Sequence, residues 1–186
     1  MASMREHISN YIEKLKSALD NISAEEIVDF TKILKNALDN EKMIFIMGNG
    51  GSAAFASHFA CDFNKGVSWN KEKKFRIICL NDNREIMMAY ANDISYEEIF
   101  VGQLKNFLSK GDVVIGVSGS GNSKNVLKAI EYANAFGAVT VGITGYLGGQ
   151  LKNLAQHSVN TNIEDMQISE DVHLAICHLI MQYFNN

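Results

Sequence analysis

Short apolar runs at five places in the sequence constrain the fold of this chain most strongly. They are rich in Ile and Val, lack an alternating polar side, and are separated by segments long enough for a helix. Such runs are typical of strands buried on both faces of a parallel sheet and joined by right-handed helical crossovers. The sequence therefore predicts an α/β fold, a doubly wound five-stranded parallel sheet in the flavodoxin-like order 2-1-3-4-5. The expected strands are Met43–Met47, Phe75–Leu80, Asp112–Val117, Ala138–Thr144 and His157–Ile163.

Helical patterns precede and follow these runs. From about Arg5 to Asp20, apolar residues recur every three or four positions, which predicts an amphipathic helix. A second helix should begin after Ser23, because Ser23 and Glu26 have the spacing of a capping box. The last helix should run from about Asp165 to Phe184.

The length of 186 residues suits one domain, and neither a repeat nor a linker interrupts it. We therefore expect residues 1–186 to form a single domain, with residues 1–40 as an N-terminal helical extension. The apolar stripes of this extension exceed what a five-stranded sheet must cover, which indicates packing on partner subunits as well as on the sheet.

Composition excludes several classes of partner. There are 17 basic and 21 acidic residues, for a formal charge of −4, and no long basic run that would favour nucleic acid or an anionic membrane surface. No apolar run reaches the roughly 20 residues of a membrane span. Cys61, Cys79 and Cys177 lie far apart and fit reduced thiols. These features predict a cytoplasmic protein that binds neither nucleic acid nor membranes.

Two glycine-rich loops follow the first and third predicted strands, at Gly48–Ala53 and Ser118–Ser123. In the order 2-1-3-4-5 these strands are neighbours, so both loops should face one crevice at the carboxyl edge of the sheet. Glycines allow close backbone approach, and the helix that follows each loop favours a negative charge at its start. Ser118, Ser120 and Ser123 add hydroxyl donors, so the pattern predicts a phosphate site.

Two other interpretations of these loops remain open. In the first, both loops are only tight strand-to-helix turns with good helix caps. The first loop also fits Gly-x-Gly-x-x-Ala, and Asp82 could contact a ribose, as in a dinucleotide-dependent oxidoreductase. Three clustered hydroxyls suit a terminal phosphate better than a pyrophosphate, and neither loop has the Gly-Lys-Ser/Thr ending of a Walker motif.

Ionisable side chains recur at helical spacing on two segments. His58 and Asp62 are four residues apart and should share a helix face, and Glu170 and His178 should share a face of the last helix. Two helices could thus each present an acid and an imidazole. Asn92-Asp93 is a further polar pair, in a segment that has the composition of a turn.

The segments Gly48–Ser52, Asn92-Asp93 and Ser118–Ser123, together with His178, resemble the sugar isomerase (SIS) domain family. The resemblance covers nearly the whole chain, and the N-terminal helices and the terminal His favour the heptose branch. It implies aldose–ketose isomerisation of sedoheptulose 7-phosphate to a manno-configured heptose 7-phosphate, for lipopolysaccharide or capsule. It also implies a homotetramer with sites at subunit interfaces.

The resemblance assigns roles to individual residues. Substrate contacts are implied for Asn49, Gly50, Gly51 and Ser52, phosphate contacts for Ser118, Gly119, Ser120 and Ser123, and sugar contacts for Asn92 and Asp93. His178 matches the catalytic histidine, and His58 matches a histidine that helps to hold zinc in some members.

Two positions depart from the family pattern. Asp62 stands where a longer glutamate base is usual, and Glu170 stands where glutamine is usual. Losing one methylene draws a carboxylate back by about 1.5 Å, so the catalytic base could be either Asp62 or Glu170. Alternatively, His58, Asp62, Glu170 and His178 could together hold zinc. The changed acids also leave open a non-catalytic SIS protein that binds sugar phosphates, of the type that associates with a replication initiator.

Overall fold

The computed structural model describes residues 3–186 and contains the predicted sheet. Its five strands are parallel and lie in the order β2-β1-β3-β4-β5, which confirms the predicted topology. Most strand ends agree with the sequence analysis to within a residue or two, but the last strand ends three residues early, before Asn162 adopts a left-handed φ of 54°. The strands are β1 (Met43–Gly48), β2 (Arg76–Cys79), β3 (Val113–Ser118), β4 (Val139–Thr144) and β5 (His157–Asn160).

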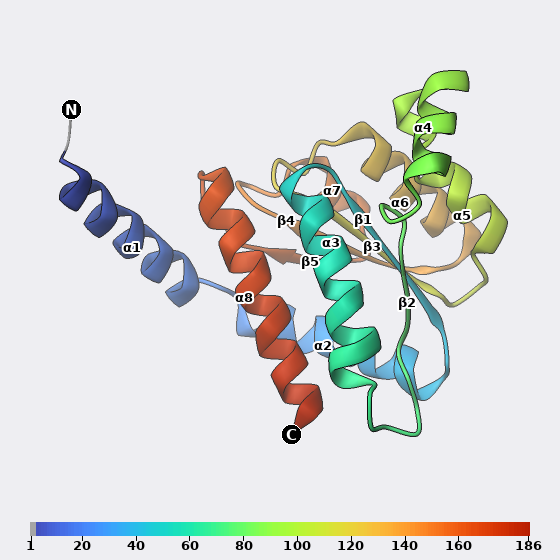
Figure 1. Cartoon of the computed structure of the whole chain (residues 1–186), viewed down its shortest axis with the longest axis horizontal. Helices are drawn as coiled ribbons and strands as arrows, with labels where there is room; N and C mark the ends of the chain where they lie inside the picture. Colours follow the sequence, from blue (N-terminus) through green and yellow to red (C-terminus); the bar gives the residue numbers. More distant parts are fainter. Residues whose placement is uncertain (1–2) are drawn as a thin grey trace.

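Helices cover both faces of this sheet (Figure 1). One hydrophobic cluster joins the sheet to α2, α3 and α8, and a second joins its other face to α5, α6 and α7. A π-helix, η1, directly continues α3, and a short 3-10 helix, η2, follows α4. The bounds are α1 (Met4–Asp20), α2 (Ala24–Asp39), α3 (Gly51–Cys61), η1 (Asp62–Val67), α4 (Arg84–Asp93), η2 (Tyr96–Glu98), α5 (Val101–Phe107), α6 (Lys124–Phe136), α7 (Gly149–Leu154) and α8 (Met166–Asn185).

An aromatic cluster fixes α3 and η1 against the sheet. Phe59 and Phe63 stack with their ring centroids 4.3 Å apart, and both rings are fully buried. Phe75 and Phe184 meet the Phe63 ring edge-on at 5.0 and 6.0 Å. This packing joins the chain before β2 to the end of α8, so the position of α3 relative to α8 is set by the core.

The capping box predicted at Ser23 forms only in part. The Ser23 side chain accepts the N–H of Glu26 and so begins α2, but the Glu26 carboxylate accepts the N–H of Asn160 instead of returning to residue 23. Glu26 therefore connects α2 to the end of β5. The reciprocal pair occurs one helix earlier, between Ser3 and Glu6 at the start of α1.

The helix α1 projects from the sheet and contacts α8 (Figure 1). The Tyr11 hydroxyl donates to Asp171, and Lys14 lies 3.2 Å from Asp165, which caps α8. Several apolar side chains of α1 remain accessible, with Met4 71% and Ile8 47% exposed. Within residues 3–186, every helix is too short or too polar to cross a membrane.

Truncating the buried ring of Phe63 to Ala should lower the free energy of unfolding by about 3–5 kcal/mol, because it removes contacts with three other aromatic rings and leaves a cavity. Chemical denaturation followed by circular dichroism measures this change. The control is Trp69→Ala, since Trp69 is 68% exposed and its loss should cost little. Equal effects of the two substitutions would contradict the importance of the aromatic cluster.

Candidate functional site

The loops after β1 and β3 lie side by side, as predicted. The two strands pair in register as far as Gly48 and Val117, so the loops leave the sheet from neighbouring positions. Beyond the strands, Asn49 and Asn125 exchange two amide hydrogen bonds of 2.9 Å. A side-chain bridge therefore connects the start of α3 to the start of α6.

The serine loop, residues 118–123, has the features of an anion site. The hydroxyls of Ser118 and Ser123 lie 3.0 Å apart, and Ser120 is exposed at the loop tip. Ser123 is the N-cap of α6, but its side chain makes no capping hydrogen bond, so the first turn of α6 keeps backbone donors for a ligand. Gly121 has a φ of 68°, and a β-carbon there would overlap the backbone of Gly148.

The β4 loop supports the serine loop from behind. Gly145 donates its N–H to the carbonyl of Gly119, and Leu151 donates its N–H to the carbonyl of Gly121, both at 2.9 Å. The amide oxygen of Asn122 accepts the backbone N–H of Gln150. The serine loop is thus held by backbone contacts that leave its hydroxyls available.

The glycine turn after β1 brings one of the predicted acids close. Gly50 is the N-cap of α3 and has a φ of 56°. A β-carbon on Gly51 would overlap the carboxylate of Glu170, so this acid lies directly against the start of α3. The position suits a negative charge, because a helix N-terminus carries a partial positive charge. Ser52, the next residue, is buried.

Three of the four predicted ionisable residues meet between α3 and α8. Nε2 of His58 lies 2.9 Å from Nε2 of His178 and 3.2 Å from Oδ2 of Asp62. His178 Nε2 lies 3.6 Å from the same carboxylate oxygen. One potential ligand atom from each of these three residues lies within 4.8 Å of the other two.

The carboxylate of Asp62 is only partly satisfied. Its Oδ2 is buried, and neither imidazole approaches with hydrogen-bond geometry, so it has no hydrogen-bond partner among residues 3–186. Asp62 is the first residue of the π-helix η1, a type of helix that often occurs at functional sites. An uncompensated buried carboxylate is costly, and a cation bound between His58 and His178 would compensate it.

Glu170 lies outside this cluster, so the structure brings together three of the four residues considered as zinc ligands. The reason is spacing. Glu170 and His178 share a face of α8 but are eight residues apart, which is about 12 Å along a helix. The acid therefore lies at the glycine turn, whereas the imidazole lies at the C-terminal end of α3.

Asn92 and Asp93 were expected in a turn, but they form the last turn of α4. Both are exposed, and the Asn92 amide donates to the Asp93 carboxylate at 2.8 Å. All ten residues of α4 are at least partly exposed. The segment reaches the strand ends through Tyr96, whose hydroxyl donates to Oδ1 of Asn49.

His173, on α8, faces the core. It is 1% exposed, and its Nε2 donates to the carbonyl of Thr144 at the end of β4. Burial lowers the pKa of His173 to about 4, and the bond to Thr144 opposes this only partly. The ring is therefore neutral at pH 7. Its place between Val172 and Leu174 gave no sign of whether it faced inward.

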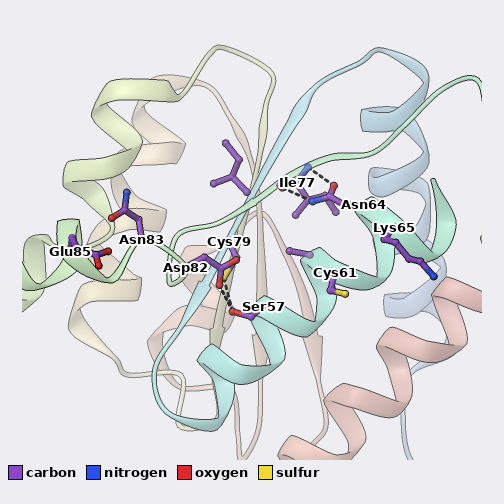
Figure 2. Close-up of a pocket in the computed structure, with 11 residues that line it drawn as sticks. Ser57, Cys61, Asn64, Lys65, Ile77, Cys79, Asp82, Asn83 and Glu85 are labelled. Carbon is purple, nitrogen blue, oxygen red and sulfur yellow. Dashed lines mark hydrogen bonds between the residues drawn. The ribbon is translucent and has the colours of Figure 1, made fainter. Parts of the chain in front are cut away.

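A cavity of about 710 Å³ lies elsewhere, along β2 and α3 (Figure 2). Ser57 and Cys61 face it from α3, and Asp82 accepts a hydrogen bond from Ser57 at its mouth. Asn64 closes the sheet edge here, because its amide pairs with both the N–H and the carbonyl of Ile77. Asp82, considered above as a ribose contact, lines this cavity, but none of the residues predicted to bind the sugar phosphate or a metal does, so size alone does not locate the candidate site.

Comparisons with known proteins agree with this architecture. A SIS domain model matches residues 9–145. The chain is 35% identical over 170 residues to the probable phosphoheptose isomerase of Thermoplasma acidophilum, covering 91% of this chain and 93% of that protein. It is 36% identical over 168 residues to the phosphoheptose isomerase of Helicobacter pylori (strain P12), covering 90% and 86%. The structure of phosphoheptose isomerase GmhA from Neisseria gonorrhoeae has the same fold, with a TM-score of 0.90, 24% identity, and coverage of 98% of this chain and 99% of that one.

The buried neutral state of His173 predicts a pH dependence of stability. The pKa is about 4 in the folded protein and near its usual 6.5 when unfolded. The unfolded chain therefore binds more protons between these values, and the free energy of unfolding should fall by about 3 kcal/mol from this residue alone as pH drops from 6.5 to 4.

Denaturation across this pH range, compared with His173→Gln, isolates the contribution. The glutamine variant can still donate to Thr144 but does not titrate, so its stability should fall less steeply. Parallel pH profiles for the two proteins would show that His173 does not titrate as proposed.

Proposed function

The chain belongs to the SIS domain family, and because its relatives at 35–36% identity are phosphoheptose isomerases, we propose that it interconverts D-sedoheptulose 7-phosphate and D-glycero-D-manno-heptose 7-phosphate. The reaction is an aldose–ketose isomerisation within one molecule. The observation that carries the proposal is that the serine loop, a candidate anion site, is connected to α3, which brings His58 and Asp62 to His178. An isomerase of sugar phosphates needs both parts.

The phosphate would be bound by the serine loop. Ser118, Ser120 and Ser123 supply hydroxyls, and Gly119 and the start of α6 supply backbone N–H groups. Gly50, Gly51 and Ser52 would border the sugar chain on the β1 side. In this proposal Asn92 and Asp93 contact the sugar only from the edge, because both are exposed at the end of α4.

Of the two carboxylates, Glu170 is the better candidate for the catalytic base. It lies against Gly51, where the sugar would pass, and it is not engaged with an imidazole. In the proposed reaction it moves a proton between C1 and C2 through an enediol, and His178 exchanges protons with the substrate oxygens. Asp62 lies between two imidazoles and serves to hold them in place.

The cluster of His58, Asp62 and His178 also fits a zinc ion. Two imidazole nitrogens and one carboxylate oxygen form a common ligand set of catalytic zinc sites, which keep a further position open. The buried Asp62 oxygen without a hydrogen-bond partner among the described residues supports this fit. When bound, the ion would polarise the substrate carbonyl.

The proposal extends to assembly and location. Exposed apolar side chains on α1, α2 and α8, among them Ile12, Val28 and Tyr183, favour burial against further copies of the chain. We propose a homotetramer of single-domain subunits, residues 1–186, with residues 1–40 at the contacts and sites at the interfaces. Three free cysteines fit the cytoplasm, where the product would enter heptose synthesis for lipopolysaccharide or capsule.

Substitution of the acids tests the catalytic roles. Glu170→Gln should lower kcat for sedoheptulose 7-phosphate by about 100-fold or more, because a general base typically contributes at least that much. His178→Gln should also lower kcat, whereas Asp62→Asn should lower it through misplaced imidazoles. Heptose formation measures the rates. Full activity of Glu170→Gln together with an inactive Asp62→Asn would transfer the role of base to Asp62, and full activity of all three variants would contradict the site.

Zinc binding can be tested apart from turnover. Titration of the metal-stripped protein with zinc should show one strong site per chain, weakened about tenfold or more in His58→Ala and Asp62→Asn. Glu170→Gln is the matched control and should bind zinc as the unaltered protein does, because Glu170 lies outside the cluster. Equal loss of affinity in the Glu170 variant would contradict the three-residue set.

A further inference from the structure

A reciprocal pair of side-chain amides joins the two halves of the proposed site. The Asn49 amide donates to Oδ1 of Asn125, and the Asn125 amide donates to Oδ1 of Asn49, both at 2.9 Å. Asn125 is 2% exposed and also accepts the N–H of Val126, which fixes the orientation of its amide. Because Asn125 is buried, leaving its amide without a partner would be costly.

Tyr96 completes the environment of Asn49. Its hydroxyl donates to the same Oδ1 at 2.9 Å, so this oxygen accepts two hydrogen bonds. An amide oxygen has two lone pairs, and one of the two amide hydrogens of Asn49 is already used by Asn125. The side chain of Asn49 is therefore largely committed within the protein, which argues against the sugar contact expected for it from the sequence.

The amide pair lies just beyond the last backbone pairing of the sheet. Backbone pairing between β1 and β3 ends at Gly48 and Val117, and the two loops then separate. Asn49 immediately precedes the N-cap of α3, which carries His58, and Asn125 lies two residues after Ser123. The pair thus works as one more cross-strand connection, placed between the anion loop and the helix that bears the imidazole.

We propose that Asn125 and Tyr96 are positioning residues that act through Asn49 to set the distance between the phosphate-binding serine loop and the reacting groups beyond the glycine turn. The inference rests on the proposed isomerase function. It predicts a specific pattern, because the serine loop has its own support from the β4 loop and does not depend on the amide pair. Loss of the pair should impair chemistry without impairing phosphate binding.

The test compares Asn125→Asp and Tyr96→Phe with the unaltered protein. Asn125→Asp removes the donor that faces Asn49 and should lower kcat by about 100-fold, the scale expected for a displacement near 1 Å. Tyr96→Phe removes one hydroxyl from an exposed ring, is compatible with folding, and should lower kcat about fivefold. In Tyr96→Phe, which adds no charge near the serine loop, the inhibition constant of inorganic phosphate should be unchanged. Tyr132→Phe is the matched control, since its ring stacks on Phe136 away from both loops.

The values of kcat and of the phosphate inhibition constant decide whether Asn125 and Tyr96 are positioning residues; this is the inference. A loss of kcat in both variants with unchanged phosphate inhibition in Tyr96→Phe supports it, whereas unchanged kcat, or parallel loss of phosphate inhibition in Tyr96→Phe, overturns it. If the unaltered protein does not convert sedoheptulose 7-phosphate, the proposed function fails. Crystal structures of the unaltered protein and Asn125→Asp then decide the positioning role. A glycine turn displaced from the serine loop supports that role, and an unmoved turn overturns it.

Discussion

The pairing of β1 with β3 is the interaction on which the rest of the site depends. Because both strands are parallel and adjacent, their carboxyl ends deliver two loops to one edge of the sheet, and each loop begins a helix. One helix starts with backbone donors beside the serine hydroxyls, and the other, with η1, brings His58 and Asp62 to α8. No single segment contains both the serine loop and the acids, so the candidate site depends on the sheet that joins them.

The sequence predicted this framework well, for a physical reason. Strands buried on both faces need continuous apolar runs, and these runs have few alternative structures once helices separate them. Helical spacing paired His58 with Asp62 and Glu170 with His178, but only the structure shows that His58 and Asp62 meet His178. Similarly, the partner of Asn49 is 76 positions away, and nothing in the local pattern around Asn125 distinguishes a bridging amide from a surface one.

Helical spacing limited what could be predicted for Glu170. A shared face says that Glu170 and His178 point in the same direction, but it does not say which neighbours each side chain meets. The structure places the Glu170 carboxylate against Gly51 and the His178 imidazole beside His58 and Asp62. The two departures from the family pattern, Asp62 and Glu170, therefore have different structural consequences. Asp62, although short, already lies within 3.2 Å of one imidazole. Glu170 places an additional carboxylate beside the glycine turn.

Three side chains of α8 therefore contact three different parts of the structure around the candidate site. Glu170 lies at the turn before α3, His178 meets the acid and imidazole farther along α3, and between them His173 enters the core and binds the carbonyl of Thr144. The residue after Thr144 is Gly145, whose N–H holds the serine loop through Gly119. A neutral His173 thus links the helix that carries Glu170 and His178 to the serine loop. Because protonation of this buried ring would oppose its burial, acid should weaken the contact between α8 and the end of β4.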